Sequence, residues 1–425
     1  MPETPGARDA KIAGSRLAIF LTVFIHLLGF GIIIPVLPYY AETYGATGFT
    51  VGLLSTSFSI MQFLFAPFWG RFSDRVGRRP VLLGSLVLTS ASYVTYALAG
   101  SLPVLFISRL VAGIAGATIS TAQAYMADTT TREERTKGMG LIGAAFGLGF
   151  IFGPALGGIL SRWGYSVPGF AAAAIALGAA VFAYFRLPES LPPEARVETE
   201  IRMHHPAATL VEAIRRPRVG PVLLLFFTGT LCFSGMESTF ALFGQHGYGL
   251  GAQGVGYILA FAGVLSATMQ AGLVGALARR FGERALVWAG FLLLGLGFMA
   301  AGTTPPFGAF VAAMGVASVG SGLSTPALSG LASLLTPADE QGGILGLYQS
   351  LGSLARSVGP ILGGMAYDQL GHGSPLWLGG IVLVLASFYA VRLPRRERVL
   401  RAAVPDEAGS RTAAPDARGS EAPRA

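Results

Sequence analysis

Long apolar segments alternate with short polar turns along almost the whole chain. A membrane-spanning helix needs about 20 mostly apolar residues, and twelve segments of the chain meet that requirement. They are expected at 17–40, 50–70, 80–99, 103–125, 138–161, 168–187, 219–244, 252–277, 285–302, 307–334, 342–366 and 376–393. The pattern predicts an all-α membrane protein with twelve transmembrane helices.

A polar segment rich in proline and charge, at 188–218, interrupts this series halfway. We interpret it as the linker between two six-helix bundles, at 17–187 and 219–393. Within it, residues 206–216 have the pattern of a short amphipathic helix that would lie on the membrane surface. The sequence thus predicts two halves of similar size joined by a polar connection.

The two halves repeat each other. The sequence GRFSDRVGRRPVL, which starts at Gly70, returns in degraded form as GALARRFGERALV at Gly275. The sequence GPALGG, which starts at Gly153, returns as GPILGG at Gly359. The two offsets are 205 and 206 residues, so we predict an internal duplication. Paired repeats that meet around a central site are the expected design of a secondary transporter.

The charges report the orientation in the membrane. Only 12% of the residues are charged, whereas 52% are hydrophobic. Of the 30 Lys and Arg, all but Arg109, Arg162 and Arg356 lie in the tails, in the linker or in loops on one side of the predicted membrane. The positive-inside rule then predicts that both tails, 1–16 and 394–425, are cytoplasmic. We expect the second tail to be disordered, and we attribute the net charge of +8 to topology rather than to nucleic-acid binding.

Several classes of chemistry find no support in the sequence. The single Cys232 lies in an apolar segment, so neither an internal disulfide nor a cysteine metal site is possible. His204 and His205 lack partners at ligand spacing and are expected to be solvated. There is no phosphate-binding loop and no nucleophile constellation. We therefore predict no enzyme activity, no cofactor and no bound metal.

The most specific motif is the charged turn GRFSDRVGRRP at 70–80, which must lie at a membrane face. Its residues Gly70, Asp74, Gly77 and Arg78 match the loop between the second and third helices of the major facilitator superfamily. The chain therefore resembles that family, and the resemblance implies its fold, with two pseudo-symmetric six-helix bundles.

Three further stretches are similar to the drug/proton antiporter branch, especially to tetracycline exporters. The first is LGFGIIIPVLP at 28–38, and the second is RLVAGIAGA, which begins at Arg109. The third is GLGFIFGPALGG at 147–158. The residues that carry the first-helix signature and the antiporter motif are Gly29, Pro35, Pro38, Gly149, Gly153, Pro154, Gly157 and Gly158. The resemblance implies proton-driven export by a protein that functions as a monomer.

The resemblance also implies roles for these motifs. Asp74 and Arg78, with Arg75 beside them, look like a gate-latching pair, and Asp128 occupies the place of a second acid. We hypothesise that an Asp74–Arg78–Asp128 network holds the cytoplasmic side shut; the alternative is a solvated turn that only sets topology. The glycines of the antiporter motif are four residues apart on one helix face, where they form either a pivot or a simple packing surface.

Charged residues inside the spans are functional candidates, because a charge in hydrocarbon is costly. Arg109 shares a helix face with Gly113, Gly116, Ser120 and Gln123, so we expect this face to line the cavity. The resemblance implies a role for Arg109 in proton coupling; the alternative is a structural arginine bonded to helix carbonyls.

Glu237 and Arg356 are the candidates in the second half. Glu237 either pairs with Arg356, titrates during transport, or lies near the outer face in water, because a lone buried carboxylate is expensive unless it is paired or protonated. The sequence does not choose among these three.

His26 stands where tetracycline exporters typically have Asp, with Thr22 and Gly29 on its face. An imidazole can bind and release protons near neutral pH, so His26 is a candidate proton carrier or substrate contact; the alternative is a hydrogen-bonded packing residue. Because the acid is absent, tetracycline is in doubt as a substrate.

The sequence as a whole predicts a multi-pass protein of a bacterial inner membrane that exports a small, rather apolar molecule in exchange for protons. One alternative is a transporter of a sugar or other metabolite on the same fold. A second is a membrane sensor or scaffold that transports nothing.

Overall fold

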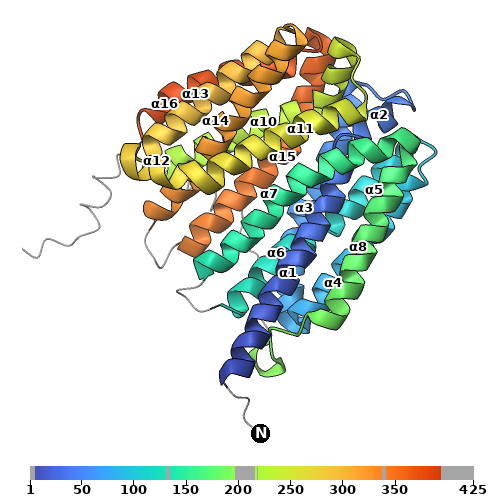
Figure 1. Ribbon diagram of the computed structural model, residues 1–425, viewed down its shortest axis with the longest axis vertical. Coiled ribbons are helices and arrows are strands. Elements are labelled where there is room, and N and C mark those ends of the chain that lie inside the picture. Colours follow the sequence, from blue (N-terminus) through green and yellow to red (C-terminus); the bar gives the residue numbers. More distant parts are fainter. Residues whose placement is uncertain (1–4, 131–134, 197–215, 218, 337–340, 394–425) are drawn as a thin grey trace, which may run out of the picture.

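The structure is a computed structural model that describes residues 5–130, 135–196, 216–217, 219–336 and 341–393. Over those residues it is built from helices, and Figure 1 shows two bundles side by side, one coloured blue to green and the other yellow to red. Each of the twelve predicted spans is helical where it is described, so the predicted fold class is confirmed. The second tail and most of the predicted amphipathic helix lie outside the described residues.

The first bundle contains all the elements before the linker. These are α1 (Pro5–Ile33), α2 (Leu37–Glu42), α3 (Gly48–Val76), α4 (Arg78–Ala97), α5 (Leu102–Ile114), α6 (Ala117–Asp128), α7 (Arg135–Leu160), the short η1 (Ser161–Trp163), α8 (Ser166–Arg186) and the short η2 (Pro193–Ala195). Helix α1 starts well before the expected first span, so part of the segment expected as an N-terminal tail is helical.

The second bundle contains the elements after the linker. These are α10 (Gly220–Tyr248), α11 (Ala252–Thr268), the π-helical η3 (Met269–Leu273), α12 (Val274–Phe281), α13 (Glu283–Gly302), α14 (Phe307–Leu334), α15 (Gln341–Leu370) and α16 (Ser374–Ala390). In the described part of the chain, nine helices are long and apolar enough to cross a membrane, and two shorter apolar helices, Leu17–Ile33 and Ser374–Ala390, add to them.

Proline explains the interruption in the first span. Helix α1 ends at Ile33 and α2 begins at Leu37, with Pro35 between them and Pro38 in the first turn of α2. Proline has no N–H to donate and its ring clashes with the preceding turn, but it is tolerated in the first turn of a helix. The first-helix signature therefore ends one helix and starts the next.

The predicted duplication appears in the helix pairing. Helix α1 packs against α7 in the first bundle, as α10 packs against α15 in the second. Across the two bundles, α3 packs against α15 and α11 packs against α7. Each of these helix contacts made by one bundle thus has an equivalent contact made by the other bundle.

The repeated GPxLGG sequences make both kinds of contact. A Cβ atom on Gly157 would overlap Ile32 of α1, and one on Gly363 would overlap Gly235 of α10. The next residue in each copy faces the other bundle. Gly158 lies against the start of α11, and Gly364 lies against the start of α3.

The molecule has two chemically distinct ends. We call the end with the α3–α4 turn at Gly77 the charged end, and the end with Tyr39, Tyr165 and Tyr248 the tyrosine end. Helix α2, at the tyrosine end, lies at the opposite end of α1 from the N-terminus (Figure 1). The hydrogen bonds between the described parts of the two bundles lie towards the tyrosine end, and Thr56, which donates to the carbonyl of Ser357 at 2.7 Å, is the deepest of them.

Large apolar side chains on α3 and α11 are accessible to solvent or lipid. On α3, Leu64 and Phe68 are 55% and 50% exposed, and on α11 Phe261 is 42% exposed. Only 11% of the apolar stretch of Ala252–Phe281 is buried inside the protein. The bundles are therefore joined by hydrogen bonds towards the tyrosine end, and α3 and α11 also carry apolar side chains that solvent or lipid can reach.

Candidate functional site

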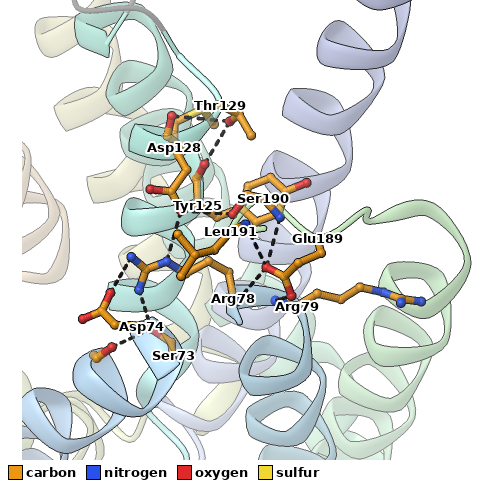
Figure 2. Close-up of polar contacts among 12 residues, drawn as sticks. Ser73, Asp74, Arg78, Arg79, Tyr125, Asp128, Thr129, Glu189, Ser190 and Leu191 are labelled. Carbon is orange, nitrogen blue, oxygen red and sulfur yellow. Dashed lines mark hydrogen bonds and ion pairs between the residues drawn. The ribbon is translucent and has the colours of Figure 1, made fainter. Parts of the chain in front are cut away.

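The charged turn places Arg78 at the centre of a polar cluster. Gly77 has φ +115°, a conformation that favours glycine, and it separates α3 from α4. The Arg78 side chain is only 10% exposed, and its Nη2 lies 2.6 Å from Asp74 Oδ1. Its Nε lies 3.1 Å from Asp128 Oδ2, and its Nη1 donates to Ser73 Oγ at 2.6 Å. The predicted Asp74–Arg78–Asp128 contacts are thus present (Figure 2).

This cluster joins three helices of a single bundle. Asp74 lies on α3, Arg78 on α4 and Asp128 on α6. Gly70 and Arg75, expected in a turn, lie in the last two turns of helix α3, where Arg75 is exposed. Within the described residues the network does not reach the second bundle, so its role as a latch stays a prediction.

Glu189, just after α8, is a member of this cluster that the sequence analysis missed. Its carboxylate accepts hydrogen bonds from the backbone N–H groups of Arg78 at 2.8 Å and Arg79 at 3.2 Å, the first residues of α4. It also accepts from the N–H groups of Ser190 at 3.0 Å and Leu191 at 3.1 Å. A carboxylate at a helix N-terminus satisfies unpaired donors and complements the helix dipole.

The chain that follows α8 is fastened to the cluster at two further points. Ser190 Oγ donates to Asp128 Oδ2 at 3.1 Å, and Tyr125 Oη donates to the carbonyl of Pro188 at 3.0 Å (Figure 2). A Cβ atom on Gly77 would overlap the Glu189 carboxylate. The start of the predicted linker is therefore an ordered brace on the α3–α4 turn.

Arg109 is buried inside the first bundle, at 3% exposure. Its guanidinium carbon lies 5.4 Å from the centroid of the Tyr96 ring, and Tyr93 and Tyr96 of α4 are the groups that act on its charge. Its Nη2 has no hydrogen-bond partner in the described part of the chain. An unpaired donor on a buried cation is unusual, which keeps Arg109 a candidate for a functional role.

The predicted polar stripe that starts at Arg109 is wrong as a continuous helix face. The fourth span breaks after Ile114 and resumes at Ala117. Gly113 and Gly116 pack against α3 of the same bundle, where Phe58 and Gln62 lie closest. Two glycines in this run, at 113 and 116, weaken the helix locally, and the small residues serve helix packing rather than a cavity wall. Gln123 is half-buried on α6.

Glu237 on α10 and Arg356 on α15 act on each other electrostatically. They form no direct ion pair in this conformation, and Arg356 Nη2 instead lies 3.4 Å from Ser353 Oγ. Helices α10 and α15 are in close contact at this depth, because Ser234 Oγ donates to the carbonyl of Ala355 at 3.2 Å. Both charged residues are half-buried.

Aromatic rings flank these groups in both bundles. Phe226 and Tyr348 stack with centroids 3.5 Å apart, and a Cβ atom on Gly352 would touch both Phe226 and Arg356. In the first bundle Phe30 packs against Phe58 and Phe150, with centroids 5.2 Å and 6.1 Å apart. Tyr348 is buried, at 7% exposure, so its ring packs inside the second bundle.

His26 is buried in the first bundle, at 8% exposure, and its Nδ1 lacks a hydrogen-bond partner in the described residues. Gly29, on the same face, packs against Tyr93 of α4 and Ala172 of α8. Thr22 donates within α1 to the carbonyl of Ala18 at 2.8 Å. This face is turned into the bundle, so a route for protons or substrate to His26 would have to pass between helices.

The antiporter motif on α7 lies at the junction of the bundles. Gly149, Gly153 and Gly157 all face α1. The carbonyl of Pro154 lies against Gly256 of α11, in the other bundle. The stripe therefore packs closely, and its action as a pivot stays a prediction. Among the described residues, no group of three His, Cys, Asp or Glu is placed to hold a metal ion.

Comparison with known proteins identifies the family. The family model for the Major Facilitator Superfamily matches residues 19–282 and 271–421. The chain is 31% identical to tetracycline resistance protein class B of Escherichia coli, over 89% of this chain and 94% of that protein. It is 32% identical to multidrug resistance protein 2 of Bacillus subtilis, over 85% of this chain and 91% of that protein.

A solved structure gives the same answer. The crystal structure of the human organic anion transporter MFSD10 (TETRAN) matches with a TM-score of 0.68 and 26% identity, over 91% of this chain and all of that one. The motifs, the paired bundles and these matches agree: the chain belongs to the major facilitator superfamily of membrane transporters.

Proposed function

We propose that this protein exports a small apolar or amphipathic compound in exchange for protons, by alternating access. One observation carries the proposal: within the described residues, the hydrogen bonds between the two bundles lie towards the tyrosine end. An alternating-access transporter needs such a state and its mirror image. The two equivalent contacts between the bundles, α3 with α15 and α7 with α11, support a rocking motion of one bundle on the other.

The charge distribution supports an orientation. Lys and Arg are concentrated in the charged-end loops and in both tails, so the positive-inside rule assigns that end to the cytoplasm. The hydrogen-bonded tyrosine end would then face the outside, in the inner membrane of a bacterium. Substrate would enter from the cytoplasm and leave at the tyrosine end.

Two relatives have names that refer to tetracycline and multidrug resistance. In this chain few charged residues lie within the spans, and aromatic rings such as Phe30 and Phe58 pack beside one another, which favours an amphipathic aromatic substrate. Because His26 replaces the acid typical of tetracycline exporters, we place multidrug-type export ahead of tetracycline export.

Glu237 and Arg356 are the proposed coupling pair. A half-buried carboxylate without a direct partner is expensive as an anion. Protonation of Glu237 would remove its attraction for Arg356 and alter the α10–α15 contact. Proton binding and substrate binding would then favour different orientations of the bundles.

The proposal is tested in proteoliposomes that contain the purified protein and an imposed pH gradient. We expect amphipathic aromatic dyes to accumulate against their concentration gradient, and a protonophore to abolish this accumulation. A tetracycline serves as the second probe. Dye flux that is unaffected by the gradient would overturn proton coupling, and the absence of flux for every probe would overturn drug export.

A further inference from the structure

The tyrosine end holds a titratable pair that joins the two bundles. His246, on α10, places its Nε2 3.4 Å from Oε1 of Glu42, on α2 of the other bundle. Its Nδ1 lies 2.7 Å from the hydroxyl of Tyr367 on α15. The side chains of His246 and Glu42 are 37% and 28% exposed, so protons from solution reach both.

Further hydrogen bonds between the bundles surround this pair. The two carboxylate oxygens of Asp368, on α15, accept the N–H groups of Gly48 and Phe49 at the start of α3, each at 2.8 Å. The hydroxyl of Tyr39, on α2, donates to the carbonyls of Ala241 and Leu250, at 3.0 Å and 2.8 Å. These bonds cross between the bundles, but they involve no group that changes charge near neutral pH.

We propose that the Glu42–His246 pair is a proton-binding site that controls the separation of the bundles at the tyrosine end. The inference rests on the proposed alternating access. A neutral imidazole donates from only one nitrogen, whereas an imidazolium donates from both, here to the Glu42 carboxylate and the Tyr367 hydroxyl. Protonation also turns the contact with Glu42 into a charge-assisted bond, which is stronger. Acid therefore holds the tyrosine end closed.

The charged and titratable neighbours of His246 come from three elements. Glu42 on α2 faces the ring of His246, and Asp368 on α15 adds a second negative charge next to Tyr367. His372, in the turn after α15, lies with its ring centroid 4.7 Å from that of His246 and opposes the imidazolium when it is itself protonated. The hydroxyls of Tyr39 and Tyr367 stay neutral near pH 7. Attraction by the two carboxylates therefore makes protonation of His246 strengthen the contact between the bundles.

If acid holds the tyrosine end closed, this has a consequence for the transport cycle. With the proposed orientation, the tyrosine end faces the outer compartment, which is the acidic side of an energised bacterial membrane. A proton taken up there by the outward-open state would close that side and return the protein to the cytoplasm-open state. The same pair would be deprotonated more often when the gradient collapses, and the return step would slow.

The experiment measures the opening directly, by the distance between two spin labels across the tyrosine end. Cys232 is first replaced by Ala, because it is the only cysteine of the chain. Labels are placed at Leu98→Cys in the first bundle and Ala309→Cys in the second, both exposed and outside the pair. Between about pH 8 and about pH 5.5, which straddles the ordinary titration of histidine, we expect the short-distance population to grow severalfold.

Substitutions assign that response to the pair. Glu42→Gln and His246→Gln should each remove the pH dependence, whereas Glu194→Gln, an exposed acid at the charged end, should preserve it. His246→Arg carries a permanent charge and should hold the short distance at both pH values, which provides a second test if His246→Gln does not fold. A response that survives in Glu42→Gln and His246→Gln, or a distance that never changes with pH, would overturn the proposal.

This experiment tests the Glu42–His246 pair separately from the proposed function, because the distance measurement needs no substrate or gradient. If labelled protein responds to pH but vesicles show no proton-coupled flux, the pair stands and the proposed exchange fails. If flux is coupled to protons while the distance ignores pH, the exchange stands and the pair fails.

Discussion

At the residue scale, the charged turn shows what sequence can and cannot predict. The contacts of Arg78 with Asp74 and Asp128 were expected, because Asp74 and Arg78 belong to one motif of known spacing and the family resemblance implies a second acid at Asp128. Glu189 was missed, since its partners at the start of α4 are 110 and 111 residues away along the chain. Nothing local distinguishes it from the other acids of a proline-rich segment.

Replacement of Asp74 with Ala should collapse transport while membrane insertion and folding survive. The Asp74 side chain is 46% exposed, and an exposed ion pair contributes at most about 1 kcal/mol to stability. Its loss should therefore change the melting temperature little. Dye flux in proteoliposomes, set against expression level and thermal stability, checks this. Unchanged flux would refute the latch and leave the turn as a topology signal.

Replacement of Glu189 with Ala should lower stability as well as transport, unlike replacement of Asp74. Its carboxylate satisfies two N–H groups at the start of α4, and the loss of such a cap destabilises a protein by about 1 kcal/mol. We expect a lower melting temperature together with reduced transport. Glu194→Ala, at an exposed position of the same segment, is the matched control and should match the unmodified protein. Equal melting temperatures for the two variants would show that the brace is dispensable.

At the element scale, helix positions followed from the apolar pattern, but helix interruptions followed only in part. The break at Pro35 is encoded by the residue itself. The π-helical turn at Met269–Leu273 and the break after Ile114 contain no proline. They depend on packing against neighbouring helices, which the pattern of one segment does not report.

The antiporter helix α7 allows a matched pair of substitutions. A Cβ atom on Gly157 would overlap the backbone of Ile32 in α1, whereas one on Gly147, in the same helix, would meet nothing within 4 Å. Gly157→Ala should therefore lower both thermal stability and transport, and Gly147→Ala should raise helix propensity without harm. Thermal unfolding in detergent and dye flux measure the two effects. Equal behaviour of the two variants would contradict close packing at Gly157.

At the scale of the whole molecule, two short repeats at one offset were enough to predict the duplication. They did not predict which end of the molecule is closed, because the proposed alternating-access cycle requires one sequence to encode two states. The polar contacts that close the tyrosine end come from Glu42, His246 and Asp368, residues outside the family motifs. Their partners lie in the other bundle, far away along the chain, so sequence spacing contains no sign of them.

The coupling pair belongs to this largest scale, because its effect is a change in the balance between two states of the whole protein. Glu237→Gln resembles a permanently protonated carboxyl and removes the charge that acts on Arg356. We expect downhill dye flux to persist, while acceleration by a pH gradient and the dependence of flux on pH are lost. Glu194→Gln controls for the loss of one charge. Gradient-driven accumulation that survives in Glu237→Gln would exclude Glu237 as the proton carrier and move the search to His26 and to Arg109, the buried groups of the first bundle.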